Sequence, residues 1–260
     1  MSVATLILAG GVVKDRDAAG WEPHLPPGVK NRALLDLGGK TMLERVVAPV
    51  RAAAPGRIFV AGDGPLPAGC LPASGGATLL ETLLSGVAAL DSHETRLLVV
   101  TADIPFLTAE SLEDILRRAP EAAAFVYPIV EASRCYERFP EMKRTVVKTA
   151  QGTFTGGNVV LIDAAFAREK SEVIRDAYAA RKSPLRLAGM LGLGTLLRLA
   201  ASPIFPAALP IPYLEAAVGR LLGGVEVSAL TTPFAEIGAD IDRPDDVILA
   251  RRYLALTETD

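Results

Sequence analysis

The sequence predicts an α/β fold in which a doubly wound, mostly parallel sheet carries helices on both faces. Short apolar runs of strand type alternate with longer segments of helical type through the first half of the chain. This alternation is typical of parallel strands joined by right-handed crossovers. Two of the apolar runs also end in residues that suit a ligand site, Gly10-Gly11 and Asp103. Ligands bind at the carboxyl ends of strands in open α/β sheets, so both observations favour the same fold.

The expected elements follow in chain order. They are a strand at 5–9, a helix near 40–53, a strand at 57–61, a helix near 77–90, a strand at 97–101 and a helix near 108–118. Thr78, with Glu81 three residues later, predicts a capping box at the start of the second helix. Pro244, Asp245 and Asp246 predict the start of a C-terminal helix, because proline suits the first turn and acids favour the N-terminal end of the dipole.

Length and composition set broad limits. With 260 residues, 50% of them hydrophobic, the chain can bury a full core, and we expect one domain over residues 1–260. The net charge of −3 gives no reason to expect nucleic acid as a partner. Cys70 and Cys135 have no metal-ligand spacing and suit a reducing compartment. The apolar run at the N-terminus is too short to span a membrane and lacks a preceding basic residue, so we expect a cytoplasmic protein.

A helical insert is expected at about residues 165–224, with its helices near 185–222. This segment is rich in Leu, Ala and Gly, but Arg186, Arg198, Arg220 and a group of prolines divide it into pieces too short to cross a membrane. The pattern therefore predicts two or three short helices joined by a proline-rich turn, without stable membrane insertion. A buried insert is the favoured interpretation, and a peripheral membrane or partner surface is the alternative.

Two kinds of segment carry the candidate chemistry. A buried strand that opens into Gly10-Gly11 lets backbone N–H groups approach a phosphate, because glycine has no Cβ; the alternative is a plain tight turn. Carboxylates appear at Asp103, where a strand ends, and at Asp240 and Asp242, two residues apart on one face of a short extended piece. We interpret the nearby Asp245 and Asp246 as helix caps.

These segments resemble the GT-A type nucleotidyltransferases, most closely the MobA-like family related to the molybdenum-cofactor nucleotidyltransferases. The resemblance covers roughly residues 1–163 and 225–255 and does not reach the segment between them. Four ordered motifs carry it: Leu8-Ala9-Gly10-Gly11, the stretch R-A-L-L-D-L-G-G-K-T-M-L from Arg32 to Leu43, Asp103-Ile104-Pro105, and D-I-D-R-P-D-D from Asp240 to Asp246.

The resemblance implies a GT-A, Rossmann-like fold and a Mg²⁺-dependent nucleotidyltransferase. Such an enzyme transfers an NMP unit from an NTP to a small phosphorylated acceptor and releases pyrophosphate. CTP or GTP is the expected NTP. A non-catalytic nucleotide-binding regulatory protein of the same fold is one alternative, motivated by the altered first loop. A GT-A glycosyltransferase is another, which the Gly-Gly and G-G-K-T-M-L features disfavour because they serve a triphosphate.

The resemblance also implies a role for individual residues on the nucleotide side. Backbone and cationic groups expected at the nucleotide are Leu8, Ala9, Gly10, Gly11, Lys14, Arg16, Gly75 and Gly76. Lys30, Arg32 and Asp103 are expected to be catalytic. The family usually has a lysine at the position of Arg32, so the choice of phosphate ligand among Lys14, Arg16, Lys30 and Arg32 stays open. For Gly75 and Gly76, backbone contact with the nucleobase and a plain helix start are equal alternatives.

Metal and acceptor residues complete the expected site. Asp103 and Asp242 are expected to hold Mg²⁺, since hard carboxylate oxygens suit a hard cation. Asp240 lies on the same face of the short extended piece as Asp242, but it stands one step from the position that the family uses for this ligand. The expected acceptor ligands are Lys143, Arg144, Gly157 and Asn158, with a charged hairpin as the alternative for the two cations.

Overall fold

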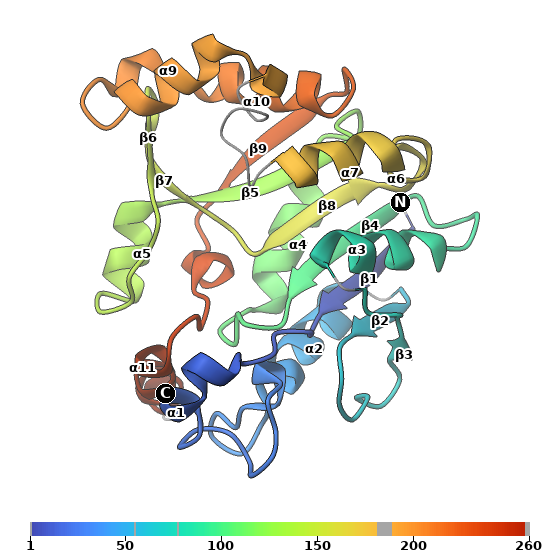
Figure 1. Ribbon diagram of the computed structural model, residues 1–260, viewed down its shortest axis with the longest axis vertical. Helices are drawn as coiled ribbons and strands as arrows, with labels where there is room; N and C mark the ends of the chain where they lie inside the picture. Colours follow the sequence, from blue (N-terminus) through green and yellow to red (C-terminus); the bar gives the residue numbers. More distant parts are fainter. Residues whose placement is uncertain (1, 55, 77, 181–188, 258–260) are drawn as a thin grey trace.

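The computed structural model describes every residue except 1, 55, 77, 181–188 and 258–260 (Figure 1). Residues 181–188 of the predicted insert therefore lie outside the described part. Within that part, nine strands form one sheet in the order β3-β2-β1-β4-β8-β5-β7-β6, with β9 paired to β5. The strands are β1 (Val3–Leu8), β2 (Ile58–Ala61), β3 (Leu71–Pro72), β4 (Arg96–Thr101), β5 (Phe125–Glu131), β6 (Val147–Thr149), β7 (Gly152–Gly156), β8 (Val159–Asp163) and β9 (Val227–Thr232).

Helices connect and cover these strands. The α-helices are α1 (Ala18–Trp21), α2 (Met42–Ala53), α3 (Leu79–Ala88), α4 (Ala109–Arg118), α5 (Ala132–Arg138), α6 (Ala164–Glu169), α7 (Ser171–Ala180), α9 (Leu193–Ala201), α10 (Ile211–Leu221) and α11 (Pro244–Thr257). Short 3-10 helices are η1 (Asp15–Asp17), η2 (Arg32–Leu34), η3 (Pro206–Ala208) and η4 (Ala235–Gly238). The helices and strands predicted for the first half of the chain are thus confirmed.

The first half of the sheet is parallel. β1 pairs in parallel with β2 and with β4, and β2 pairs in parallel with β3. In this register Leu8 at the end of β1 lies beside Ala61 of β2 and Thr101 of β4. The carboxyl ends of these strands therefore meet at one edge of the sheet, which is where Gly10-Gly11 and Asp103 emerge.

The second half of the sheet is mixed. β8 is antiparallel to both of its neighbours, β4 and β5, and β7 is antiparallel to β5 and β6. Only β9 returns parallel to β5. The predicted α/β class is confirmed, while the parallel pairing stops at β4. Between β6 and β7 the antiparallel pairing follows from the connection, since two residues can join antiparallel strands but not parallel ones, which need a long crossover.

Side chains alternate between two apolar layers, as a doubly wound sheet requires. Ile7 and Leu98 face the layer that contains α2, α4 and α11. Leu6 and Leu97, their sequence neighbours, face the layer that contains α3 and α6. Helices therefore cover both faces of the sheet, and the backbone at the carboxyl edge is left accessible.

The insert forms short helices, as predicted, but it is not buried as expected. α9 and α10 lie at one end of the molecule beyond β6 and β9, joined by the proline-rich turn that contains η3 (Figure 1). Leu193 and Leu197 on α9 are 67% and 62% exposed. The expectation of a buried insert is wrong for α9, because this helix contacts α10 through one side, where Thr195 meets Tyr213. No helix within the described ranges is long and apolar enough to cross a membrane.

Helix starts follow the predicted capping chemistry. Thr78 and Glu81 form the expected capping box, in which each side chain accepts from the other residue's backbone N–H. Asp246 caps the start of α11, accepting hydrogen bonds from the N–H groups of Asp242 at 3.1 Å and Arg243 at 2.8 Å. The cap fixes the direction in which the chain enters α11, immediately after the aspartates of the candidate site.

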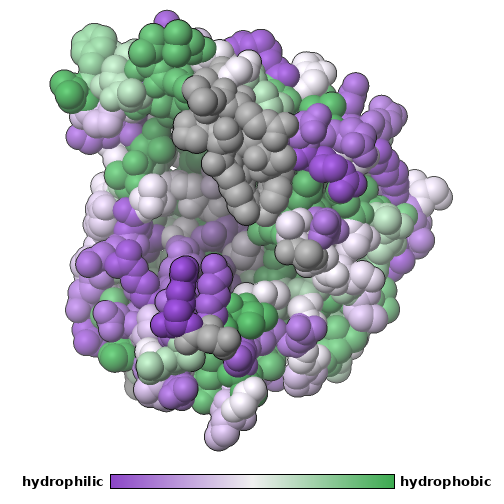
Figure 2. All heavy atoms as spheres, in the orientation of Figure 1, coloured by the Kyte–Doolittle hydropathy of each residue, from purple (hydrophilic) through white to green (hydrophobic). Residues whose placement is uncertain are grey.

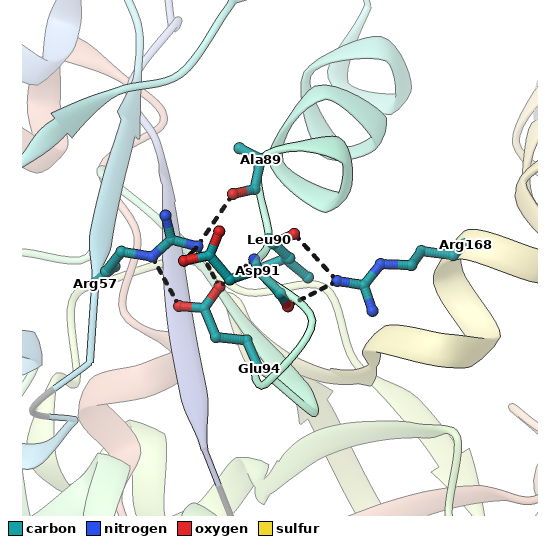
Figure 3. Close-up of polar contacts among 6 residues, drawn as sticks. All are labelled: Arg57, Ala89, Leu90, Asp91, Glu94 and Arg168. Carbon is teal, nitrogen blue, oxygen red and sulfur yellow. Dashed lines mark hydrogen bonds and ion pairs between the residues drawn. The ribbon is translucent and has the colours of Figure 1, made fainter.

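A charged cluster ties together the opposite edge of the sheet, at the amino ends of β2 and β4 (Figure 3). Arg57 donates to both carboxylate oxygens of Glu94, with Nε 3.0 Å from Oε1, and to the carbonyl of Ala89 at 3.1 Å. Its Nη2 also lies 3.0 Å from Asp91 Oδ2. From α6, Arg168 donates to the carbonyls of the same loop. Glu94 is 3% exposed, so its charge depends on Arg57.

We expect Glu94→Gln to lower the free energy of unfolding by about 1–3 kcal/mol at pH 7, because it weakens charge-assisted hydrogen bonds. The hydrogen bonds from Arg57 lower the pKa of Glu94. Its stabilising effect is therefore complete above the ordinary glutamate pKa of about 4.3 and is lost as the pH falls through the folded-state value. Urea unfolding measured from pH 7 downward should show that the difference in unfolding free energy between wild type and Glu94→Gln decreases as the pH falls.

The matched control is Glu141→Gln. Glu141 pairs with Arg252, but both side chains are more than half exposed, so its removal should cost less than about 1 kcal/mol. Equal unfolding midpoints for wild type and Glu94→Gln would contradict the prediction, as would a gap that persists at acid pH.

Candidate active site

Three carboxyl groups meet where β4 ends. Asp103 follows β4, and Asp240 and Asp242 lie in the segment between η4 and α11, which descends from β9 to α11 (Figure 1). The N–H of Ile241 donates to the carbonyl of Asp103 at 2.9 Å. The predicted extended piece is partly wrong, since residues 235–238 form the turn η4. The two aspartates nevertheless flank Ile241, which is fully buried.

The carboxylates perturb one another. Burial is the main cause that raises the pKa of Asp103, with Asp242 adding to it and Arg32 opposing it. Burial, followed by the charges of Asp242 and Asp103, raises the pKa of Asp240 to about 7. Like charges held this close disfavour the ionised form of each acid. The three acids therefore repel one another when they are ionised, and a bound cation would reduce this repulsion.

The donor set fits a hard divalent cation. Oδ1 of Asp103 is buried and has no hydrogen-bond partner among the described residues. Asp242, in contrast, keeps 65% of its side chain exposed. Carboxylate oxygens of this kind suit Mg²⁺, which keeps several water or phosphate ligands. Within the described ranges no three His, Cys, Asp or Glu side chains form a ready-made metal cage, so further ligands would have to come from substrate and water.

The glycine loop presents unused backbone donors next to the acids. After β1, the N–H of Ala9 donates to Ala61 at 2.7 Å. The N–H groups of Gly10 and Gly11 have no partner in the part of the chain that the structure describes. A Cβ built at Gly10 would meet none of the described atoms within 4 Å. Neither glycine has a positive φ, so what glycine provides here is open space for an approaching group.

Arg32 lies between the glycine loop and the acids. Its N–H donates to the carbonyl of Gly11 at 2.9 Å, and its Nη1 donates to the carbonyl of Ile241 at 3.1 Å and lies 3.6 Å from Asp242 Oδ1. The guanidinium also stacks over Trp21, with 5.3 Å between Cζ and the ring centroid. These contacts fix a positive charge where the predicted phosphate clamp should be.

The other three candidate cations are placed differently. Arg16 pairs with the adjacent Asp17 at 3.5 Å, and both side chains are largely exposed. Lys14 and Lys30 are exposed, and the Lys30 carbonyl accepts from the N–H of Val13. Their roles at the nucleotide remain predictions.

Asn31 positions the loop and was missed in the sequence. Its Nδ2 donates to the carbonyls of Ala9 at 2.8 Å and Asp63 at 2.6 Å, and its Oδ1 accepts from the N–H of Ala33 at 2.9 Å. The residue is buried. An asparagine directly before Arg32, where the chain must turn, is the signal that would have identified it. It holds the glycine loop and Arg32 in one rigid unit.

Gly75 and Gly76 emerge after β3 at the same edge of the sheet. The N–H of Gly76 donates to Thr82 Oγ1 at 3.0 Å, and a Cβ on Gly76 would lie 2.1 Å from Glu81 Cβ. Close packing against α3 therefore explains this glycine. Gly75 has no described atom within 4 Å of a built Cβ, and its contact with a nucleobase remains a prediction.

A cavity of about 850 Å³ opens beside the acids. Of the predicted acceptor residues, Lys143, Arg144 and Asn158 line it, together with Asp240. Gly157 does not, because it is packed against Ile237. The structure thus brings the cations to the carboxylates, as expected for an acceptor site.

Arg144 and Asn158 are held by the backbone around η4. Nη1 of Arg144 donates to the carbonyl of Gly238, whereas its Nε and Nη2 are buried without a partner among the described residues. The N–H of Asn158 donates to Ile237 at 2.8 Å, and its carbonyl accepts from Thr101 at 3.1 Å. Arg144 therefore has donors available for an anion.

Tyr127 is a further cavity residue that the sequence did not single out. It comes from β5, and its hydroxyl approaches Gly156, where a Cβ would lie 2.0 Å away. Burial and the nearby charge of Asp240 raise the pKa of Tyr127. Its position on an alternating strand face is the only signal that the sequence offers.

Comparison with known proteins agrees with this geometry. A family model described as the MobA-like NTP transferase domain matches residues 5–187. A hypothetical transferase from Thermus thermophilus has a similar structure, with a TM-score of 0.80 and 37% identity over 95% of this chain and 100% of that chain. No match is found among curated proteins.

More distant structures share the fold. A CMP:2-keto-3-deoxy-manno-octonic acid synthetase solved with CTP has a TM-score of 0.61 at 12% identity, over 99% of this chain and 100% of that chain. The 2-C-methyl-D-erythritol 4-phosphate cytidylyltransferase from Thermus thermophilus has a TM-score of 0.52 at 19% identity, over 99% and 100%. With its match to the family model over most of its length, the chain belongs to the MobA-like NTP transferase family and is a nucleotidyltransferase.

Proposed function

We propose that this enzyme transfers an NMP unit from a Mg²⁺-bound NTP to a small phosphorylated acceptor and releases pyrophosphate. The observation that carries the proposal is the convergence at one sheet edge of unused N–H groups, a fixed guanidinium and a cluster of carboxylates. Arg32 contacts both sides of this arrangement, bonding to Gly11 through its backbone and to Ile241 through its side chain.

Electrostatics assigns the steps. An acceptor phosphate oxygen attacks the α-phosphorus, the new O–P bond forms, and the bond to the β-phosphate breaks so that pyrophosphate leaves with the electron pair. Both reactants are anions, so the site must supply positive charge and fixed donors rather than a covalent nucleophile. Gly10 and Gly11 bind phosphate through their N–H groups, Arg32 neutralises charge, and Lys143 and Arg144 bind the acceptor phosphate.

Asp103 and Asp242 are the residues that would hold Mg²⁺, and Asp240 lies beside both. When bound, the cation would supply Lewis-acid charge neutralisation at the phosphates. The buried, unpartnered Oδ1 of Asp103 and the raised pKa of Asp240 support this assignment. CTP is the first nucleotide to test, because one structural neighbour was solved with CTP and another is named a cytidylyltransferase.

A pyrophosphate-release screen that crosses CTP, GTP, ATP and UTP with phosphorylated acceptors tests the proposal as a whole. Release that needs one NTP, one acceptor class and Mg²⁺ is the expected result. Binding of Mg²⁺-NTP without release on any acceptor would favour a regulatory protein of the same fold.

Asp103→Asn and Asp242→Asn should each abolish Mg²⁺-dependent NTP binding, because each removes a hard anionic ligand. Titration calorimetry with and without EDTA measures the effect. Asp245→Asn is the matched control, since Asp245 is exposed at the start of α11 and outside the cluster. Unchanged Mg²⁺-NTP affinity in both site variants would refute the metal assignment.

Gly10→Ala should weaken NTP binding about tenfold or more, because a methyl group enters the space that the phosphates need and loosens hydrogen bonds to them. The fold should tolerate this change, since the built Cβ has no described neighbour within 4 Å. Gly189→Ala, whose Cβ is equally open, controls for a general glycine effect. Normal NTP affinity in a folded Gly10→Ala protein would show that the loop is only a turn.

Lys143→Ala and Asn158→Ala should leave NTP affinity nearly unchanged and lower kcat/KM for the acceptor about ten- to a hundredfold, the scale of a lost charge-assisted hydrogen bond. Lys148→Ala, an exposed lysine on β6 that does not line the acceptor cavity, is the control. Steady-state kinetics with the acceptor varied gives the measurement. Equal losses of NTP binding in both variants would instead place these residues in the nucleotide site.

A further inference from the structure

The cavity beside the carboxylates is larger and more apolar than a small polyol phosphate requires. Its volume of about 850 Å³ lies toward the upper end of the roughly 300–1,000 Å³ typical of ligand pockets. Polar groups come from the segments around the acids. Thr149, Thr155 and Glu215 add polar groups elsewhere in the lining. The apolar side chains come from β5, β7, α9 and α10 among other elements, including Phe125, Ile129, Phe154, Leu199, Leu214 and Val218.

These apolar side chains are not simply part of the core. On β5, Val126 and Val130 are fully buried, whereas the alternating Phe125, Tyr127 and Ile129 line the cavity and stay partly exposed. Successive side chains of a strand point to opposite faces, so one face of β5 packs inside and the other faces open space. An apolar sheet face that its own chain leaves partly open is available to a ligand.

Hydrogen bonds tie α10 and the turn before it to β9 and to the connection between β6 and β7. Glu215 of α10 accepts from the N–H of Ala229 at 2.8 Å, and the N–H of Ile211 donates to Gln151 Oε1 at 2.8 Å. The N–H of Ala150 donates to the carbonyl of Leu209 at 3.1 Å. Leu214, next to Glu215 in the middle of α10, lines the cavity. Figure 2 shows hydrophobic surface around α9 on one side of a hollow and hydrophilic surface on the facing side.

We infer that the acceptor is amphipathic: a phosphate monoester whose alcohol carries a hydrocarbon or aromatic group. This inference rests on the proposed function. The phosphate binds Arg144 and Lys143 next to the carboxylates, and the apolar group lies between β5 and the helices α9 and α10. The nucleotide residues Gly10, Gly11 and Arg32 do not line this cavity, whereas Asp240 and Asp242 do, so the cavity adjoins the proposed nucleotide site at the acids.

The test measures binding of inorganic phosphate, ethyl phosphate and hexyl phosphate to the intact protein by calorimetry, with Mg²⁺-CTP titrated separately. Burying four additional methylene groups should make hexyl phosphate bind at least tenfold more tightly than ethyl phosphate, a conservative fraction of the transfer effect. Vesicles carrying monohexadecyl phosphate, which is a monoester like the inferred acceptor, form a second arm. If the protein also binds these vesicles, the acceptor is a component of a bilayer. If it binds hexyl phosphate alone, the acceptor is freely dissolved.

Leu214→Asn should remove the gain from ethyl to hexyl phosphate while inorganic phosphate binds as before. Leu197→Asn is the matched control, because it makes the same change on a helix at a side chain that is 62% exposed and outside the cavity lining. Equal affinity of wild type for both alkyl phosphates would overturn the inference, as would a gain that survives in Leu214→Asn. Failure of the wild type to bind any of Mg²⁺-bound CTP, GTP, ATP and UTP, with the chain-length gain intact, would overturn the proposed function instead.

Discussion

One backbone hydrogen bond organises the site. The N–H of Ile241 donates to the carbonyl of Asp103 and so joins the segment before α11 to the end of β4. Ile241 is buried between Asp240 and Asp242 in the chain, so this bond brings both aspartates near Asp103, where the three acids interact. The carbonyl of the same residue accepts from Arg32. A single residue, Ile241, thereby links the acids to the cation Arg32.

The resulting charges are balanced only in part. Arg32 opposes the shift at Asp103, yet Asp240 still has its pKa raised to about 7 by burial and by its two acidic neighbours. On the acceptor side, Arg144 keeps two buried guanidinium nitrogens unpartnered among the described residues. Unsatisfied polar groups are costly in a folded protein, and such cost concentrates at functional sites. Arg32 offsets the acids only in part and Arg144 has unpartnered donors, so bound substrates with their metal would supply the missing partners.

The sequence predicts the features that depend on residues close together in the chain, and it misses those that depend on residues far apart. Local patterns were sufficient for β1, β4 and the capping box at Thr78, because apolar periodicity and helix caps are fixed within a few residues. The mixed half of the sheet and the supporting role of Asn31 were missed, since both depend on partners far along the chain. The acids were identified through motif order, but only the fold shows that Ile241 sets their spacing. The exposed face of α9 was not foreseen, because an amphipathic segment does not reveal what covers it.

The distance along the chain between Arg32 and Ile241 has a consequence for biosynthesis. The two residues are 209 positions apart. A ribosome adding roughly 5–20 residues per second needs on the order of 10 to 40 s to synthesise that stretch. During this interval the glycine loop and β4 can fold together, but the nascent chain has neither Asp240 nor Asp242. The candidate site is therefore complete only when the last part of the chain is made, and an incomplete polypeptide has one of the two carboxylates proposed to hold Mg²⁺.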